Sequence, residues 1–256
     1  MTNPSSEYSN REVLSNEEID DMIRAADNLK IEYYQLRAKC LVAIAKKFGK
    51  RRIEIARLKR LDIEKLDNDL QFSFTIAKKH KKGLFQYIKE AEGLIKDGKM
   101  DPSVLAKPLP DIRLDWKAWQ ETEQGHRYKS DTALQAMSIE DKYAKYILNY
   151  LQFLSIHYPE SEYLFPSGVE LFGSGEYVLK GKKPLTGSQL LRIVKPLNPS
   201  AWLHLFRETK GAEIAKRFGR TITAISEVRE SLDLEEESTA YHYVRRYAAK
   251  KQETET

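Results

Sequence analysis

The first half of the chain begins with apolar residues at helical spacing. After a polar stretch over residues 1–14, Ser15 and Glu18 have the spacing of a capping box, and the apolar pattern IDDMIRAADNL follows. A second helix is predicted over about 32–48, because Gly49 is a good C-terminal residue for it. The next segment, KRRIEIARLKRLDIEKLD, predicts a short amphipathic helix that leads into a turn.

The middle of the chain contains the clearest strand signal. The segment LQFSFTIAKK alternates with period two and is rich in aromatic and β-branched residues. Residues 126–137 predict a returning strand, and residues 84–125, one helical piece with Pro-rich connections, are interpreted as an insertion. Residues 138–159 predict a strongly amphipathic helix that ends at a proline.

The C-terminal part predicts a Gly-rich hairpin followed by helices. The segments LTGSQLLRIVKPLNP, AWLHLFRETKGAEIAKRFG, TITAISEVRESLDL and EEESTAYHYVRRYAAKK each have a helical pattern. The sequence therefore predicts a mainly α fold with a small antiparallel β-sheet (α+β). We expect one large domain over residues 15–250, with a flexible tail at 1–14 and a polar tail at 251–256.

Composition narrows the class of protein. The 256 residues include 43 Lys and Arg against 38 Asp and Glu, a net charge of +5 that weakly favours a polyanionic partner. Cys40 is the single cysteine, which excludes an intrachain disulfide and a thiolate metal cluster. Because no apolar run reaches the length of a signal peptide or a membrane span, we expect a soluble, cytoplasmic protein with no membrane partner.

Four separated motifs resemble one known family when taken in order: FGKRRIEI, FTIAKKHKKG, HLFR and STAYHYVRR. They resemble the tyrosine recombinases (phage-type integrases). The catalytic domain of that family carries an arginine in a Gly-x-Arg turn followed by a glutamate. A lysine on a β-hairpin, a His-x-x-Arg helix start and a nucleophilic tyrosine near the C-terminus complete the set. The match extends over about residues 15–250.

The resemblance implies the tyrosine recombinase catalytic-domain fold and a site-specific strand exchange on DNA. The expected partner is double-stranded DNA, bound by a homo-oligomer that becomes a tetramer in synapsis. Neither a cofactor nor a metal is expected, because arginines supply the positive charge that a divalent ion provides elsewhere. Dense charge and lysine runs suggest an origin in an archaeal virus or plasmid.

Arg51 and Arg207 are the predicted phosphate-binding arginines. Attack on a phosphodiester builds negative charge on the non-bridging oxygens, which planar guanidinium groups bind and stabilise. Arg51 is preferred to Arg52 because it lies two residues after Gly49 and places Glu54 in the acidic position of the family.

Proton transfer is assigned to a histidine and a lysine. His204 lies one helical turn before Arg207, so both side chains are expected to reach the same phosphate. Lys78 and Lys79 are both candidates for donating a proton to the leaving 5′ oxygen. A strand would place them on opposite faces, so only one would enter the site. The sequence does not choose between them, with a slight preference for Lys79.

The nucleophile is Tyr243 or Tyr241. The following residues VRR and the spacing of nine from Leu234 favour Tyr243, whereas Ser238, three residues before Tyr241, favours Tyr241. Tyr243 is preferred by a small margin. Either phenol would form a 3′-phosphotyrosyl bond and so divide strand exchange into two transesterifications that conserve bond energy.

Departures from the family pattern leave two other hypotheses open. Glu208 follows Arg207 where the family often has His, and SLDL replaces Gly-His or Gly-Trp before the tyrosine helix. One alternative is a recombinase-fold DNA binder without catalytic activity. The other is a helix-turn-helix regulator built from GAEIAKRFGRTITAISEVRESL. The regulator hypothesis is weakened because the predicted second helix offers only Arg229 and acidic residues for contacts to DNA bases.

Overall fold

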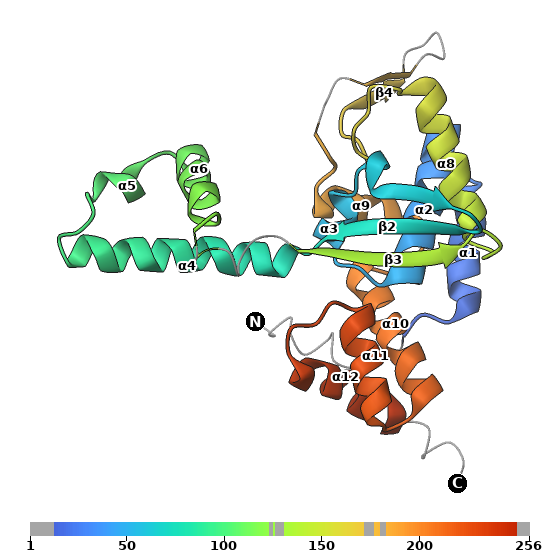
Figure 1. Ribbon diagram of the computed structural model, residues 1–256. Helices are drawn as coiled ribbons and strands as arrows, with labels where there is room; N and C mark the ends of the chain where they lie inside the picture. The colour runs from blue at the N-terminus through green and yellow to red at the C-terminus, as the bar shows by residue number, and fades with distance from the viewer. Residues whose placement is uncertain (1–12, 123–124, 126–130, 172–176, 180–182, 250–256) are drawn as a thin grey trace, which may run out of the picture. The chain divides into compact units, whose positions relative to one another are not determined.

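A computed structural model describes residues 13–122, 125, 131–171, 177–179 and 183–249 (Figure 1). The predicted tails at 1–14 and 251–256 lie outside these residues, except for the last positions of the first tail. The chain divides into two compact units, which are described separately: unit 1 consists of residues 1–74 and 134–256, and unit 2 consists of residues 75–133.

Helices make up most of unit 1, as the sequence predicts. Each of the C-terminal helical segments identified in the sequence forms a helix. In chain order the described helices of unit 1 are α1 (Asn16–Ala26), α2 (Glu32–Phe48), α3 (Arg52–Ala56), the 3-10 helix η1 (Arg60–Asp62), α8 (Ala144–His157), α9 (Gly187–Val194), α10 (Leu203–Phe218), α11 (Ile222–Ser231) and α12 (Glu237–Ala249).

Helix α1 begins with the predicted capping box. The Ser15 hydroxyl accepts a hydrogen bond from the Glu18 backbone N–H at 3.1 Å, and the Glu18 carboxylate accepts one from the Ser15 N–H at 2.7 Å. Two N–H groups that the helix itself cannot satisfy therefore have partners. Helix α2 ends as predicted at Gly49, whose φ of 58° lies in the left-handed region.

Helix α2 is the central element of unit 1. It packs against α1, α8, α9 and α10. Its residues from Cys40 to Lys46 are all buried, which is typical of a helix that is covered on every side. Phe48, at its end, contacts the rings of Phe72 and Phe74 in the sheet, with centroid distances of 4.6 and 5.3 Å.

The sheet has three strands in the order β1-β2-β3: β1 (Ile63–Leu66), β2 (Asp69–Thr75) and β3 (Thr132–Ser138). Strands β1 and β2 form an antiparallel hairpin. The sequence prediction of a helix leading into a turn was therefore incomplete, because the helical part ends at Asp62 and β1 follows it. The mainly α fold with a small antiparallel sheet is confirmed.

Strand β3 returns alongside β2, as the sequence predicts. At one end of the pair the Ile76 N–H donates to the Asp131 carbonyl at 2.9 Å, and at the other the Ile139 N–H donates to the Asn68 carbonyl at 2.8 Å. This crossed order of partners is that of an antiparallel pair. The Gly-rich hairpin is also present, as β4 (Val169–Leu171) paired antiparallel with β5 (Tyr177–Leu179).

Unit 2 is helical and has its own aromatic contacts. Its helices are α4 (Ala77–Lys96), α5 (Ser103–Ala106) and α6 (Leu109–Trp119). The Tyr87 and Trp119 rings lie 5.8 Å apart, and Trp116 is buried. The predicted insertion at 84–125 lies within this unit. In the part of the chain that the structure describes, no helix is long and apolar enough to cross a membrane.

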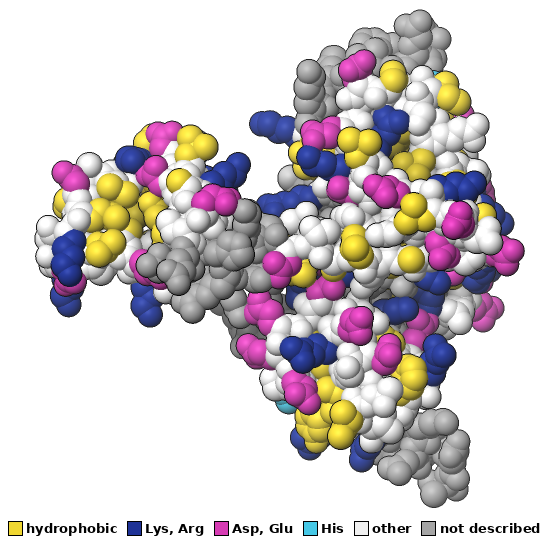
Figure 2. Space-filling model, viewed as in Figure 1, with side chains coloured by type: hydrophobic (Ala, Val, Ile, Leu, Met, Phe, Trp, Pro, Cys, Tyr) yellow, Lys and Arg dark blue, Asp and Glu magenta, His cyan; other side chains and the backbone are white. Residues whose placement is uncertain are grey.

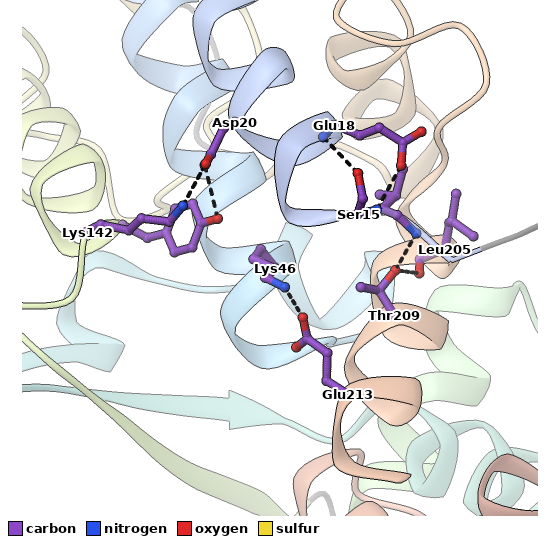
Figure 3. A network of polar contacts seen from close by, with 10 residues as sticks. Ser15, Glu18, Asp20, Lys46, Lys142, Leu205, Thr209 and Glu213 are labelled. Carbon is purple, nitrogen blue, oxygen red and sulfur yellow. Dashed lines mark hydrogen bonds and ion pairs between the residues drawn. The ribbon is translucent and has the colours of Figure 1, made fainter. Parts of the chain in front are cut away.

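Helix α10 connects the main core to a second hydrophobic cluster. That cluster lies between α10, α11 and α12, which pack against one another. On its other side α10 is attached to the segment that precedes α1 and to α2 (Figure 3): the Leu14 N–H donates to the Thr209 hydroxyl at 3.0 Å, and Lys46 pairs with Glu213. Because α10 carries His204 and Arg207, these contacts set the position of both residues.

Candidate active site

The turn after α2 brings backbone groups close to α10. A Cβ atom added at Gly49 would lie 2.9 Å from the Lys210 Cβ, so glycine serves both the left-handed conformation and the close approach of α10. The Gly49 carbonyl accepts a hydrogen bond from the Arg207 Nη1 at 3.0 Å. The end of α2 is thereby joined to the predicted phosphate-binding arginine.

Arg51 is the N-terminal cap residue of α3 and is held by Glu54. Its backbone N–H donates to Glu54 Oε2 at 2.8 Å, and its Nη1 donates to Glu54 Oε1 at 2.7 Å. Glu54 is buried, whereas the Arg51 side chain keeps 22% of its surface exposed. Glu54 therefore orients a guanidinium that solvent, or a ligand, can still reach.

Arg207 is buried and held by backbone carbonyls. It is 2% exposed, and it donates to the carbonyls of Gly49 and Leu232. Burial lowers the pKa of this guanidinium and nearby Arg51 acts in the same direction, whereas Tyr243 and Glu54 oppose them. Hydrogen bonds to both carbonyls offset the cost of burying this charge.

Tyr243 lies against α10 on the same side as Arg207. A Cβ atom added at Gly211 would lie 2.5 Å from the Tyr243 Cδ1 and 3.0 Å from its Cε1, so the ring packs directly on the backbone of Gly211. Gly211 is one helical turn beyond Arg207. The ring is thus held against α10, and Arg207 is among the groups that act electrostatically on its hydroxyl.

The electrostatic surroundings of Tyr243 link it to both arginines. Burial raises the pKa of its hydroxyl and Glu208 adds to this effect, whereas Arg207 and then Arg51 lower it. The phenolate form that a nucleophile needs is therefore disfavoured by burial and favoured by the same cations that would bind a phosphate. The structure brings together Arg51, Arg207 and Tyr243.

Tyr241 differs from Tyr243 in its surroundings. It is 49% exposed, and its ring makes an edge contact with His242, with the centroids 6.4 Å apart. Residues two apart in a helix point to nearly opposite sides of it. Tyr241 and Tyr243 therefore cannot both face α10 in the same way. Among the contacts of the described residues, none joins Tyr241 to Arg51 or Arg207.

His204 is on the expected helix, but its described partner is a carboxylate. Its side chain is 60% exposed, and its Nε2 lies 3.3 Å from Glu208 Oε1. Glu208 also accepts from the Tyr247 hydroxyl at 2.5 Å and from Arg246 at 3.4 Å. His204 contacts Glu208, whereas Arg207 contacts the carbonyls of Gly49 and Leu232. The two residues therefore lie on one helix but have different described partners.

Glu208 connects α10 to α12. The hydrogen bond from His204 lowers its pKa against the effect of burial, and Tyr247 acts in the same direction as His204. Burial and the bond to Glu208 raise the pKa of Tyr247. The residue that departs from the family pattern therefore ties the first turn of α10 to the helix that carries Tyr243.

The predicted position of Lys78 and Lys79 on a strand was wrong. Strand β2 ends at Thr75, and both lysines lie in the first turn of α4. The helical pattern around Tyr87 and Ala91, both buried, extends back through the lysines, which are good helix formers. Their side chains lie outside the described residues, and α4 belongs to unit 2, so neither lysine is placed relative to Arg51.

Sequence reasoning missed three residues around this cluster. Lys50, next to Arg51 in the sequence, is buried and pairs with Asp233. Gly211 lies beneath the Tyr243 ring. The only signal was position, since Lys50 is the middle residue of the Gly-x-Arg turn and Asp233 lies within SLDL. Lysine is rarely buried and Asp233 belongs to none of the motifs, so the sequence marks neither residue as part of a site.

Charge on the surface is mixed. In Figure 2, Lys and Arg side chains are interspersed with Asp and Glu over the visible face of unit 1. Among the described residues, no group of three or more His, Cys, Asp or Glu side chains is placed to hold a metal ion. The cluster of Arg51, Arg207 and Tyr243 is therefore distinguished by its contacts rather than by a field of one sign.

The arrangement of elements is similar to that of solved recombinases. One is the XerH site-specific recombinase bound to palindromic difH substrate in a post-cleavage complex, with a TM-score of 0.57 and 13% identity over 98% of this chain and 54% of that chain. A pre-cleavage XerH complex has a TM-score of 0.54 and 14% identity, covering 91% and 50%. The XerA recombinase has a TM-score of 0.51 and 14% identity, covering 91% and 60%.

The chain has a tyrosine recombinase fold. It spans 50% to 60% of the length of those solved chains. No protein-family model matches the sequence, and no curated protein matches it. At this level of identity the likeness concerns the fold alone, so any assignment of chemistry depends on the side chains described above.

Proposed function

We propose that the chain is a DNA strand transferase that cuts and rejoins DNA through a 3′-phosphotyrosyl intermediate. The observation that carries the proposal is the packing of the Tyr243 ring on Gly211, one helical turn beyond Arg207, where both Arg207 and Arg51 act electrostatically on its hydroxyl. A phenol beside two guanidinium groups combines a nucleophile with the donors that phosphodiester attack requires. The fold shared with site-specific recombinases supports the same chemistry.

In the proposed reaction Tyr243 loses its proton and forms a bond to the phosphorus. The bond from phosphorus to the 5′ oxygen breaks, and that oxygen gains a proton. Arg51 and Arg207 bind the non-bridging oxygens, whose charge increases in the transition state. Arg207 has its backbone bonds already made, so little reorganisation is needed when the phosphate arrives. The reverse reaction with another 5′ hydroxyl rejoins the strands.

The other predicted site residues keep their proposed roles. His204 would contact the phosphate and assist proton movement, since its ring is exposed at the start of α10. Lys78 or Lys79 would donate the proton to the 5′ oxygen. Double-stranded DNA is the proposed substrate and a homo-oligomer on DNA the proposed active form. An origin in an archaeal mobile element and a cytoplasmic location stay predictions from the sequence.

A nicked suicide substrate tests the proposal. Such DNA releases a short fragment on cleavage and traps the covalent adduct, which migrates slowly in SDS gels. We expect an adduct with the native chain and with Tyr241→Phe, and none with Tyr243→Phe. Loss of the adduct in Tyr241→Phe alone would assign the nucleophile to Tyr241.

A DNA binder without catalytic activity is the second candidate. Burial raises the pKa of Tyr243, and Glu208 adds to this, which opposes formation of the phenolate. Arg207 is also 2% exposed, which leaves little of its guanidinium accessible to a phosphate. DNA binding that weakens steeply with salt, with no adduct from any suicide substrate of the bound sequence, would favour this candidate.

A further inference from the structure

Lys50 is a fully buried lysine, and its ammonium group has a defined set of partners. Its side chain has 0% exposure, and its Nζ pairs with the Asp233 carboxylate. The same Nζ lies 5.0 Å from the centroid of the Phe74 ring in β2. A buried ammonium group is strongly destabilising unless it is paired, so this contact is unlike a surface salt bridge.

Asp233 lies in the linker between α11 and α12. Its φ of 46° is in the left-handed region, which is unfavourable for most residues other than glycine and is tolerated by Asp and Asn. The residue before it, Leu232, gives its carbonyl to Arg207. Two cations from different elements therefore bind consecutive residues of the segment that leads into the tyrosine helix.

The charges around Lys50 come from three elements. Burial lowers the pKa of its ammonium group, Asp233 and Glu54 raise it, and Arg207 lowers it. Lys50 thus belongs to the same electrostatic cluster as the residues proposed to bind phosphate. Because none of its side chain is exposed, it cannot itself contact DNA, and any effect on the reaction must be indirect.

We propose that the ion pair of the buried Lys50 with the half-buried Asp233 positions the linker before α12, and thereby holds Tyr243 against α10 beside Arg207. Lys50 is a positioning residue in this account and not a catalytic one. The pair joins the Gly-x-Arg turn, which carries Arg51, to the linker that leads to Tyr243. It therefore fixes the separation of the arginines and the nucleophile. This inference rests on the proposed function only for its effect on cleavage.

Four variants separate positioning from stability. Lys50→Met and Asp233→Asn each remove one charge of the pair. The double variant Lys50→Met with Asp233→Gly removes both charges and places glycine at the left-handed position, so it should recover much of the thermal stability. Lys47→Met is the matched control, because it breaks an ion pair of α2 with Asp141, Nζ to Oδ2 2.6 Å, that is not connected to α12.

The first measurement is the single-turnover rate of cleavage, alongside the Kd for DNA. We expect Lys50→Met and Asp233→Asn to cleave at least about 10-fold more slowly with a Kd within about 3-fold of the native chain, since misplaced reacting groups lower the rate more than binding. We expect the double variant to regain stability without regaining the rate, and Lys47→Met to cleave normally. A double variant that cleaves at the native rate would overturn the inference.

The second measurement is hydrogen exchange, which does not depend on cleavage. We expect the amides of residues 233–249 to exchange faster in Asp233→Asn, and in Lys50→Met if that variant folds, but not in Lys47→Met. Faster exchange with no adduct from the native chain would refute the proposed function while supporting the positioning of the linker. Unchanged exchange at these amides in a folded variant would refute the positioning itself.

Discussion

Gly211 sets how closely the Tyr243 ring approaches α10. In Gly211→Ala the new Cβ would lie 2.5 Å from the ring, so the ring must move and its hydroxyl should leave Arg207. We expect cleavage to fall about 100-fold, because displacement of reacting groups by about 1 Å has effects of this size. The single-turnover rate of cleavage at saturating DNA, compared between Gly211→Ala and the native chain, measures this fall.

Gly93 provides the control for this substitution. It lies within α4, and a Cβ atom added there would have no neighbour within 4 Å. Gly93→Ala should therefore raise the stability of α4 by up to about 1 kcal/mol and leave the cleavage rate unchanged. Equal loss of cleavage in both alanine variants would show that Gly211 has no special relation to Tyr243.

Glu208 gives a pH-dependent test at the scale of one residue. The hydrogen bond from His204, and then that from Tyr247, lowers its pKa. The pKa of a glutamate in the unfolded chain is about 4.3, and the pKa of Glu208 in the folded chain is lower. Its ionised form therefore stabilises the folded chain above about pH 4.3, and this stabilisation is lost as the pH falls through the folded-state pKa. Urea titrations should therefore show Glu208→Gln less stable than the native chain at pH 7, by about 1–2 kcal/mol.

The difference between these chains should shrink as the pH falls below about 4. It should not grow there, because protonated Glu208 and glutamine make similar neutral hydrogen bonds. A difference independent of pH from 7 to 3 would contradict the assigned origin of the lowered pKa.

At this scale the sequence predicted residues that belong to spaced motifs. Arg51, Arg207 and Tyr243 were identifiable because each has a fixed distance from a glycine, a histidine or the C-terminal pattern. Lys50 and Asp233 were not, because their pairing joins positions 183 residues apart and a lysine is not expected to be buried. No local pattern carries such a contact.

Element boundaries follow local signals where caps are present. Ser15 and Gly49 were read correctly as the start of α1 and the end of α2 because each acts on its own neighbours. The boundary between β2 and α4 was misread. Alternation in LQFSFT continues into lysines that fit either a strand or a helix, so the sequence does not mark the end of β2 at Thr75.

The cap of α1 makes a prediction about an element. Ser15→Ala removes the acceptor for the Glu18 N–H, and we expect it to lower the free energy of unfolding by about 1 kcal/mol. Ser226→Ala in α11 is a matched control, because Ser226 is exposed within a helix and alanine is the better helix former. A stability change of the same sign and size in both, measured by urea denaturation, would argue against the capping box.

At the scale of the whole molecule, unit 2 is an insertion in the chain between the neighbouring strands β2 and β3. Because the Ile76 N–H and the Asp131 carbonyl are bonded at 2.9 Å, an Asn-Gly turn in place of residues 77–130 should close β2 and β3 into a hairpin. We expect the shortened chain to unfold cooperatively, since the main core lies in unit 1. Thermal denaturation followed by circular dichroism tests this.

The shortened chain also tests the lysines, because it lacks Lys78 and Lys79. If one of them protonates the 5′ oxygen, cleavage of ordinary DNA should fall about 100-fold or more. A substrate with sulfur at the bridging 5′ position has a leaving group that needs no proton, and its cleavage should be largely retained. Equal losses on both substrates would exclude a proton-donating role for these lysines.

The most direct test of the central claim is to locate the covalent bond. The native chain is incubated with a suicide substrate, digested with protease and nuclease, and the peptide that carries nucleotide is sequenced by mass spectrometry. We expect the modified residue to be Tyr243, linked to a 3′ phosphate. A bond at Tyr241 or at any other residue, or a 5′ linkage, would contradict it.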